Sequence, residues 1–169
     1  MGTPPIQPVN HSNEPDTGSL GARSGDRRYT ASARRMYSPQ VLDHFEHPRN
    51  AGTVTDADAS ARIENPACGD VLELTVKEAG GRIAEIRFKA KGCVAAMACG
   101  SAVTELVSGK TVGEARDLSR EELVRAVGGL PAASTHASHL AIETLAAVLE
   151  KISGKTQRAA GGAFPASAS

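Results

Sequence analysis

The feature that most constrains the fold is a pair of alternating runs separated by two glycines. Leu72, Leu74 and Val76 fall on one face of residues 71–78, and residues 85–90 repeat the alternation of apolar and charged side chains. A period of two is typical of a strand with one face in the core and the other in water. Gly80-Gly81 follows the first run and favours a turn. The two runs predict an antiparallel hairpin, and we expect another strand near residues 61–64.

Helix signals flank this hairpin on both sides. A short helix is expected from Ser38-Pro39, an N-cap followed by proline, through Glu46. Residues after Cys93 become helical, and two later helix starts have capping-box spacing, Thr111 with Glu114 and Ser119 with Glu122. A final helix over about 135–152 would bury Leu140, Leu145, Val148 and Leu149. Strands followed by helices predict an α+β fold, a small antiparallel sheet of about three strands with helices packed on one face.

These signals are confined to residues 36–154, which we take as one domain. Residues 1–35 are rich in Pro, Gly, Ser and Arg, and they contain few large apolar side chains. Such a segment buries too little surface to offset the entropy of ordering, so we expect a disordered N-terminal extension with Met36 as the natural start. Residues 155–169 are small or polar and are expected to form a disordered tail.

Charge and hydropathy exclude two classes of partner. The 169 residues carry 19 basic and 19 acidic side chains, so the formal net charge is zero and the composition does not indicate a nucleic-acid partner. No run approaches the roughly 18 to 20 apolar residues of a membrane span. Three cysteines are a small and odd number for a disulfide framework, but they can serve as metal ligands or reactive thiols. We therefore expect a soluble, cytoplasmic protein.

Cys93 and Cys99 are predicted to have different roles. Six helical residues separate two Cα atoms by about 9 Å, beyond the roughly 7 Å limit for a disulfide, so the two thiols should not pair. Cys99 shares a helical stripe with Val103 and Leu106 and is expected to pack in the core. Cys93 stands where the helix begins, and unsatisfied amide groups there favour the thiolate.

Three further residues are candidates for a site with Cys93. Cys68 precedes the hairpin and Cys93 follows it, so both should lie at the same end of the sheet. Asp70 is two residues from Cys68, and His136 begins the final helix with His139 on the same face. Two thiolates, a carboxylate and an imidazole would make a tetrahedral zinc set or an incomplete iron–sulfur set. A plain turn at Asp70, a structural cysteine and a solvated histidine remain alternatives.

Five segments in the right order resemble the IscU-type iron–sulfur cluster scaffolds, which include the N-terminal domain of NifU. They cover nearly all of residues 36–152. The segments are YSPQVLDHFEHPRNAG (37–52), NPACGD (65–70), FKAKGC (88–93), TELVSGK (104–110), and LP (130–131) followed by HAS (136–138). The resemblance implies the α+β fold argued above.

The resemblance also implies a function and a site. It places Cys68, Asp70, Cys93 and His136 on the family's ligand positions, and it places Ala137 where the family has a third cysteine. We expect a non-enzymatic scaffold that transiently binds a [2Fe–2S] cluster or iron, takes sulfur from a cysteine desulfurase and serves apo-protein clients. Cys68 and Cys93 would supply the two thiolate ligands of the cluster.

Two departures and two alternatives accompany this expectation. After Leu130-Pro131 the chain does not continue with the Pro, Val and Lys of the family's chaperone-recognition segment, which argues against docking of the dedicated Hsp70-type chaperone. The loss of a thiol at Ala137 leaves open which cysteine accepts sulfur. The alternative functions are a zinc-dependent sulfur acceptor that works with a cysteine desulfurase, and a structural zinc-binding domain.

Overall fold

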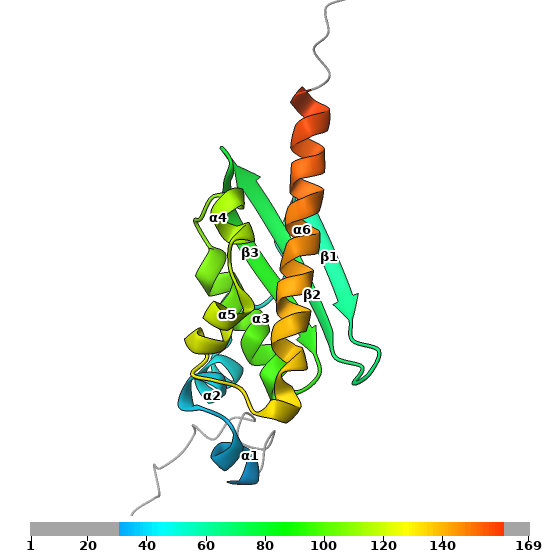
Figure 1. Cartoon of the computed structure of the whole chain (residues 1–169). Coiled ribbons are helices and arrows are strands. Elements are labelled where there is room, and N and C mark those ends of the chain that lie inside the picture. Colours follow the sequence, from blue (N-terminus) through cyan, green and yellow to red (C-terminus); the bar gives the residue numbers. More distant parts are fainter. Residues whose placement is uncertain (1–30, 161–169) are drawn as a thin grey trace, which may run out of the picture.

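The computed structural model describes residues 31–160 as a sheet with helices on one of its faces (Figure 1). The antiparallel sheet has the strand order β1-β2-β3. This arrangement confirms the predicted α+β class. The strands are β1 (Ala59–Glu64), β2 (Val71–Ala79) and β3 (Arg82–Lys91), and the helices are α1 (Ala31–Met36), α2 (Pro39–Glu46), α3 (Val94–Val107), α4 (Val112–Arg116), α5 (Arg120–Ala126), the 3-10 turn η1 (Ala132–Ser134) and α6 (His136–Ala160).

The predicted hairpin is formed by β2 and β3. Val71 pairs with Lys91 at its open end, and Gly80 and Gly81 form the turn with positive φ angles of 60° and 78°. Glycine adopts these angles without the steric penalty of a Cβ atom. The alternating side chains Leu72, Leu74 and Val76 are almost fully buried and form part of the core. The period-two pattern therefore identified the correct core face.

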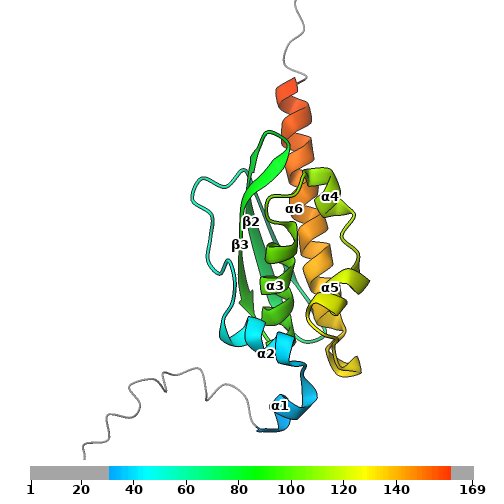
Figure 2. The same ribbon diagram turned by 90° about the vertical axis from the view of Figure 1, so that its left-hand side faces the viewer.

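The helices cover one face of the sheet in two main contacts. Helix α6 lies across β1 and β2, and α3 lies on β3 and beside α6. Figure 2 shows the sheet nearly edge-on, with these helices on one side and the segment between α2 and β1 on the other. This segment is held to the sheet by the Val54 amide, which donates to Thr75 Oγ1 at 2.9 Å. The core therefore lies between the sheet and the pair α3 and α6.

Helix α2 is attached to α3 through buried polar contacts. His44 is 8% exposed, and its Nδ1 lies 2.9 Å from Ser101 Oγ. The same hydroxyl oxygen accepts a hydrogen bond from the Arg49 amide at 2.8 Å. Burial lowers the pKa of His44, and the Arg49 charge lowers it further, against the opposing effect of Glu105 and Asp43. The neutral imidazole is therefore the form that suits this junction.

The helix-capping predictions are confirmed. The Ser38 hydroxyl accepts from the Val41 amide at the start of α2. Thr111 with Glu114 and Ser119 with Glu122 both form complete capping boxes. In each box the hydroxyl and the carboxylate satisfy amide groups that the first helical turn leaves without partners.

The helices extend beyond the expected boundaries at both ends of the domain. Helix α1 includes residues 31–35 of the expected N-terminal extension, of which residues 1–30 lie outside the described part of the chain. Helix α6 continues to Ala160, past the expected end near Ile152, so 155–160 are helical. Lys155 Nζ contacts Asp58 Oδ1 at 2.7 Å, which ties this extension to the start of β1. Residues 161–169 of the expected tail also lie outside the described part.

Several element ends meet at one end of the sheet. β1 and β3 end there, and β2, α3 and α6 begin there, at the lower end of the sheet in Figure 1. Segments that are distant along the chain are thereby brought together. Within residues 31–160, none of the helices has the length and apolar character needed to span a bilayer.

Candidate metal and cluster site

Asp70 lies at the centre of the candidate site. It immediately precedes β2 and is 4% exposed. Its Oδ1 accepts a hydrogen bond from the Cys93 amide at 3.1 Å, and its Oδ2 lies 3.1 Å from Cys93 Sγ and 3.3 Å from His136 Nε2. Burial by itself raises the pKa of Asp70, but the hydrogen bonds from Cys93, Cys68 and His136 outweigh it and lower that pKa. A buried carboxylate thus links the three other predicted site residues.

Gly92 makes the close approach between Asp70 and Cys93 possible. It has a φ angle of +154°, and a Cβ atom added there would collide with the Asp70 carboxylate. The sequence pattern identified Gly92 only as the residue that ends the strand. Its second role is visible only once β2 and β3 are paired, because this pairing brings Asp70, the residue just before β2, against Gly92 at the end of β3.

Cys93 is the N-cap of α3, as its position after Gly92 predicted. Its Sγ accepts a hydrogen bond from the Ala96 amide at 3.4 Å. The expectation that this position favours the thiolate is wrong for the metal-free protein. Burial raises the pKa of Cys93 to about 11, and the neighbouring Asp70 carboxylate adds to the rise, while the helix amides only partly oppose it. A bound cation would be needed to favour the thiolate.

Cys68 is presented by a short turn between β1 and β2. Asn65 Oδ1 accepts from the Ala67 amide at 2.9 Å, and the Asn65 carbonyl accepts from the Gly69 amide at 2.8 Å. The Asn65 amide in turn donates to the Asp70 carbonyl at 2.8 Å, which closes the turn. Cys68 is exposed at its tip and is not in a disulfide. Asn65 is a positioning residue that the sequence analysis quoted but did not single out.

Cys68, Asp70 and His136 are close enough to share one metal ion. One ligand atom from each lies within 4.8 Å of the others. Ligands around a tetrahedral ion with bonds of about 2.0 to 2.3 Å are roughly 3.5 Å apart, so only small side-chain movements are required. Cys93 is not part of this set of three, but its thiol contacts the same Asp70 oxygen as His136. The four predicted residues therefore occupy one small region.

Three other residues near the sequence motifs have different surroundings. Cys99 is fully buried in the core and free, as predicted. His139 is exposed, and its Nε2 lies 3.1 Å from Arg120 Nη1. Ala137 is 1% exposed and adds no ligand atom beside His136.

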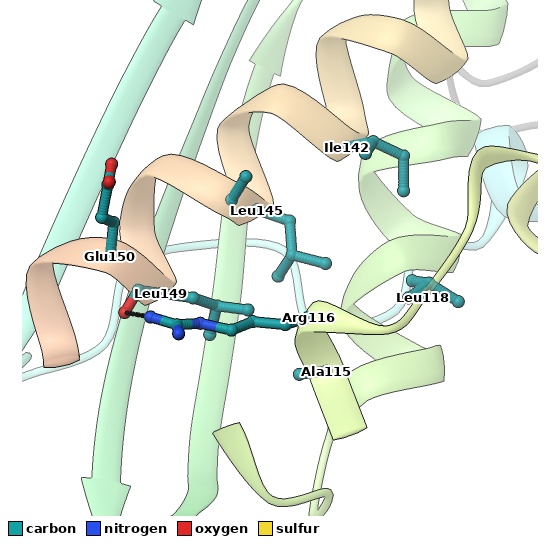
Figure 3. Close-up of a pocket in the computed structure, with 8 residues that line it drawn as sticks. Ala115, Arg116, Leu118, Ile142, Leu145, Leu149 and Glu150 are labelled. Atoms are coloured by element: carbon teal, nitrogen blue, oxygen red, sulfur yellow. Dashed lines mark hydrogen bonds between the residues drawn. The ribbon is translucent and has the colours of Figure 1, made fainter. Parts of the chain in front are cut away.

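A large hollow of about 350 Å³ lies away from these residues, between α4 and α6 (Figure 3). Leu118, Ile142, Leu145 and Leu149 form its apolar walls, and Arg116 Nη2 crosses one end to contact the Leu149 carbonyl at 3.4 Å. It contains no thiol or imidazole. Size alone does not identify the chemical site in this protein.

The fold and the site together define a class of protein. It is a small α+β domain that collects sulfur, carboxylate and imidazole ligands at one end of its sheet, on the surface rather than in a closed cage. Such a mixed ligand set suits a transition metal or an iron–sulfur cluster.

Comparisons with known proteins identify the family. The family described as the NifU-like N terminal domain matches residues 36–159, and the chain belongs to this family. The iron-sulfur cluster assembly scaffold protein IscU 1 of Archaeoglobus fulgidus is 44% identical over 110 residues, which cover 65% of this chain and 72% of that protein. The corresponding IscU protein of Aquifex aeolicus is 40% identical over 111 residues, covering 64% and 71%.

A solved structure supports the fold independently. The crystal structure of an N-terminal NifU-like protein from Brucella abortus has a TM-score of 0.59 at 18% identity and covers 73% of this chain and 98% of that one. At this identity the likeness concerns the fold alone. It agrees with the sheet and helix arrangement described above.

Proposed function

We propose that this chain is an iron–sulfur cluster assembly scaffold. Cys68 and Cys93 would bind the iron of a [2Fe–2S] cluster, or iron and sulfur before they are joined, and Asp70 and His136 would complete the ligand set. The cluster is cargo, and the scaffold makes no bond in a substrate of its own. The observation that supports this most strongly is the convergence of Cys68, Cys93 and His136 on Asp70.

The mixed ligand set supports transfer as well as binding. Asp70 forms hydrogen bonds with Cys93 and His136 when no metal is present, so these protein partners can replace the metal as it leaves. Carboxylate and imidazole ligands are also protonated or exchanged more readily than thiolates. Two thiolates would then hold the cluster less firmly than the four cysteines of a resident cluster.

The partners follow from this chemistry. A cysteine desulfurase would supply sulfur, and apo-proteins that need clusters would receive the product. Free thiols must stay reduced for this purpose, which fits the cytoplasm. The relatives reported above are named as scaffolds, and neither zinc alternative gains support from them.

Anaerobic reconstitution with ferrous iron, cysteine and a desulfurase tests the proposal. The wild-type protein should develop the visible charge-transfer absorption of an iron–sulfur cluster and should pass it to an apo-ferredoxin. Cys68→Ala and Cys93→Ala should lose most of this absorption. Cys99→Ala is the matched control, because its thiol is buried outside the site and its removal should leave the spectrum intact.

A wild-type protein that forms no chromophore, or one whose chromophore is unchanged in both Cys68→Ala and Cys93→Ala, is not a scaffold of this kind. Retention of one tightly bound zinc ion that iron does not replace would favour the structural zinc domain instead.

A further inference from the structure

The connection between α5 and α6 carries His136 to the candidate site. It spans residues 127–135 and includes the 3-10 turn Ala132–Ser134, and His136 is the first residue of α6. Within residues 31–160, the side chain of His136 forms one hydrogen bond, to Asp70, with 3.3 Å between Nε2 and Oδ2. The place where the connection sets the start of α6 therefore decides how the imidazole meets the other ligands.

Residues at the start of α2 hold this connection near both of its ends. The hydroxyl oxygens of Tyr37 and Ser134 lie 3.3 Å apart, which joins the residue two positions before His136 to the N-terminal side of α2. The Ser38 hydroxyl donates a hydrogen bond to the Val127 carbonyl, just after α5. The two contacts bridge 97 and 89 residues of sequence, so no local pattern predicts them.

Close packing adds to this attachment at Gly128. Gly128 has a φ angle of +71°, and a Cβ atom added there would lie 2.5 Å from Gln40 Oε1 and 3.1 Å from Ser38 Cβ. Only glycine adopts this angle readily and also leaves room for the neighbouring side chains. The beginning of α2 is therefore in direct contact with the connection.

Ser134 is the residue through which Tyr37 can act on His136. Ser134 is 6% exposed, and within the described part of the chain Tyr37 is the hydrogen-bond partner of its hydroxyl. The Thr135 hydroxyl donates back to the 3-10 turn at 3.0 Å, and the Ser138 hydroxyl donates to the Thr135 carbonyl at 2.7 Å. These hydrogen bonds join the turn to the beginning of α6, so a displacement of Ser134 would also move His136.

We propose that Tyr37 and Ser134 are positioning residues for His136 as a ligand of the bound metal or cluster. Their contact holds the start of α6 where the imidazole faces the Asp70 carboxylate. Hydrogen bonds outside the ligand set commonly orient metal ligands in this way. Without the contact, the ligating position of His136 is populated only part of the time, and the apparent dissociation constant of the metal rises by the inverse of that fraction. This inference rests on the proposed scaffold function, because that proposal makes His136 a ligand.

Binding of Co²⁺ alone to the full chain, without air, tests this role. Co²⁺ accepts thiolate, carboxylate and imidazole ligands, and its thiolate charge-transfer absorption reports binding at the candidate site. Tyr37→Phe removes only a hydroxyl and should raise the dissociation constant of Co²⁺ about fivefold, which corresponds to one hydrogen bond of ordinary strength. Ser134→Ala should have the same effect, and the double variant should bind no more weakly than either single variant.

A double-mutant cycle with His136→Ala separates positioning from a merely structural role. His136→Ala should itself bind Co²⁺ more weakly, and adding Tyr37→Phe to it should leave the dissociation constant unchanged, because no imidazole remains to be positioned. Thr144→Val is the matched control, since it removes a fully buried hydroxyl of α6 that bonds within the helix, to the Leu140 carbonyl at 2.7 Å. This variant should bind Co²⁺ like the wild type, and circular dichroism checks that every variant is folded.

The inference is overturned if Tyr37→Phe and Ser134→Ala bind Co²⁺ as tightly as the wild type, or if Tyr37→Phe weakens binding equally with and without His136. Either result, beside normal cluster formation by the wild type, removes only the positioning role. Wild-type affinity in His136→Ala would show that His136 is not a ligand and would overturn the inference as well. Absence of a cluster in the wild type, together with the expected double-mutant cycle, removes the scaffold function but supports the positioning of His136 at a metal site.

Discussion

The substitution Gly92→Ala tests how the structure positions Asp70. A Cβ atom at this residue would overlap the Asp70 carboxylate, so the carboxylate would move and lose its hydrogen bonds to the Cys93 amide and thiol. Each bond contributes about 1 kcal/mol net, or about 2 kcal/mol together. A non-glycine residue at φ +154° adds strain of about 1 to 3 kcal/mol.

A matched control separates the two effects. Gly52 also has a positive φ angle, +125°, but a Cβ atom there would meet only the Arg87 side chain at an ordinary distance of 3.8 Å. Gly52→Ala should therefore show the strain without the lost hydrogen bonds. Urea unfolding of the metal-free proteins should give a free energy of unfolding about 2 kcal/mol lower for Gly92→Ala than for Gly52→Ala. Equal losses would refute the positioning role assigned to Gly92.

Three further predictions concern the core, the α2 junction and the site. Gly100→Ala should lower the free energy of unfolding by about 1 to 3 kcal/mol in urea titrations, because the added Cβ atom would come within 2.9 Å of Leu72 and Phe88. An unchanged free energy of unfolding would mean that the core can shift there. Burial lowers the pKa of His44, so on acidification the unfolded chain takes up a proton at this residue before the folded protein does. The free energy of unfolding should therefore be highest above about pH 6.5 and should decrease as the pH falls towards the pKa of the folded state. Thermal unfolding at several pH values should show a smaller decrease for His44→Gln than for the wild type. Because its pKa is raised to about 11, Cys93 should be alkylated by iodoacetamide at pH 8 far more slowly than a free cysteine. Mass spectrometry measures both rates of alkylation, and equal rates would contradict this prediction.

The sequence was sufficient to predict the layered fold because its signals are local. The alternation in residues 71–78 and 85–90 requires no knowledge of distant contacts, and neither do the capping boxes at Thr111 and Ser119. The end of α6 was not predicted, and the contact that Lys155 makes there joins it to Asp58, a residue far away in sequence. Propensity in that stretch alone gave too weak a signal.

The meeting of the site residues was predictable, but their chemical state was not. Hairpin topology alone places Cys68 and Cys93 at one end of the sheet. The pKa of Cys93 depends instead on burial and on Asp70, which reaches it only because Gly92 lacks a side chain. A helix N-terminus favours a thiolate in general, but here the burial of the thiol, together with the Asp70 carboxylate, outweighs that effect on the pKa of Cys93. Such a result requires the three-dimensional contact between residues 70 and 93.

Iron K-edge X-ray absorption of the anaerobically reconstituted protein tests the central claim most directly. The claim is that thiolate, carboxylate and imidazole side chains from separate elements bind one cluster. The spectrum should show sulfur together with nitrogen or oxygen neighbours, and the nitrogen or oxygen contribution should fall in both Asp70→Ala and His136→Ala. An iron environment that contains only sulfur, or one that neither substitution changes, would contradict the account.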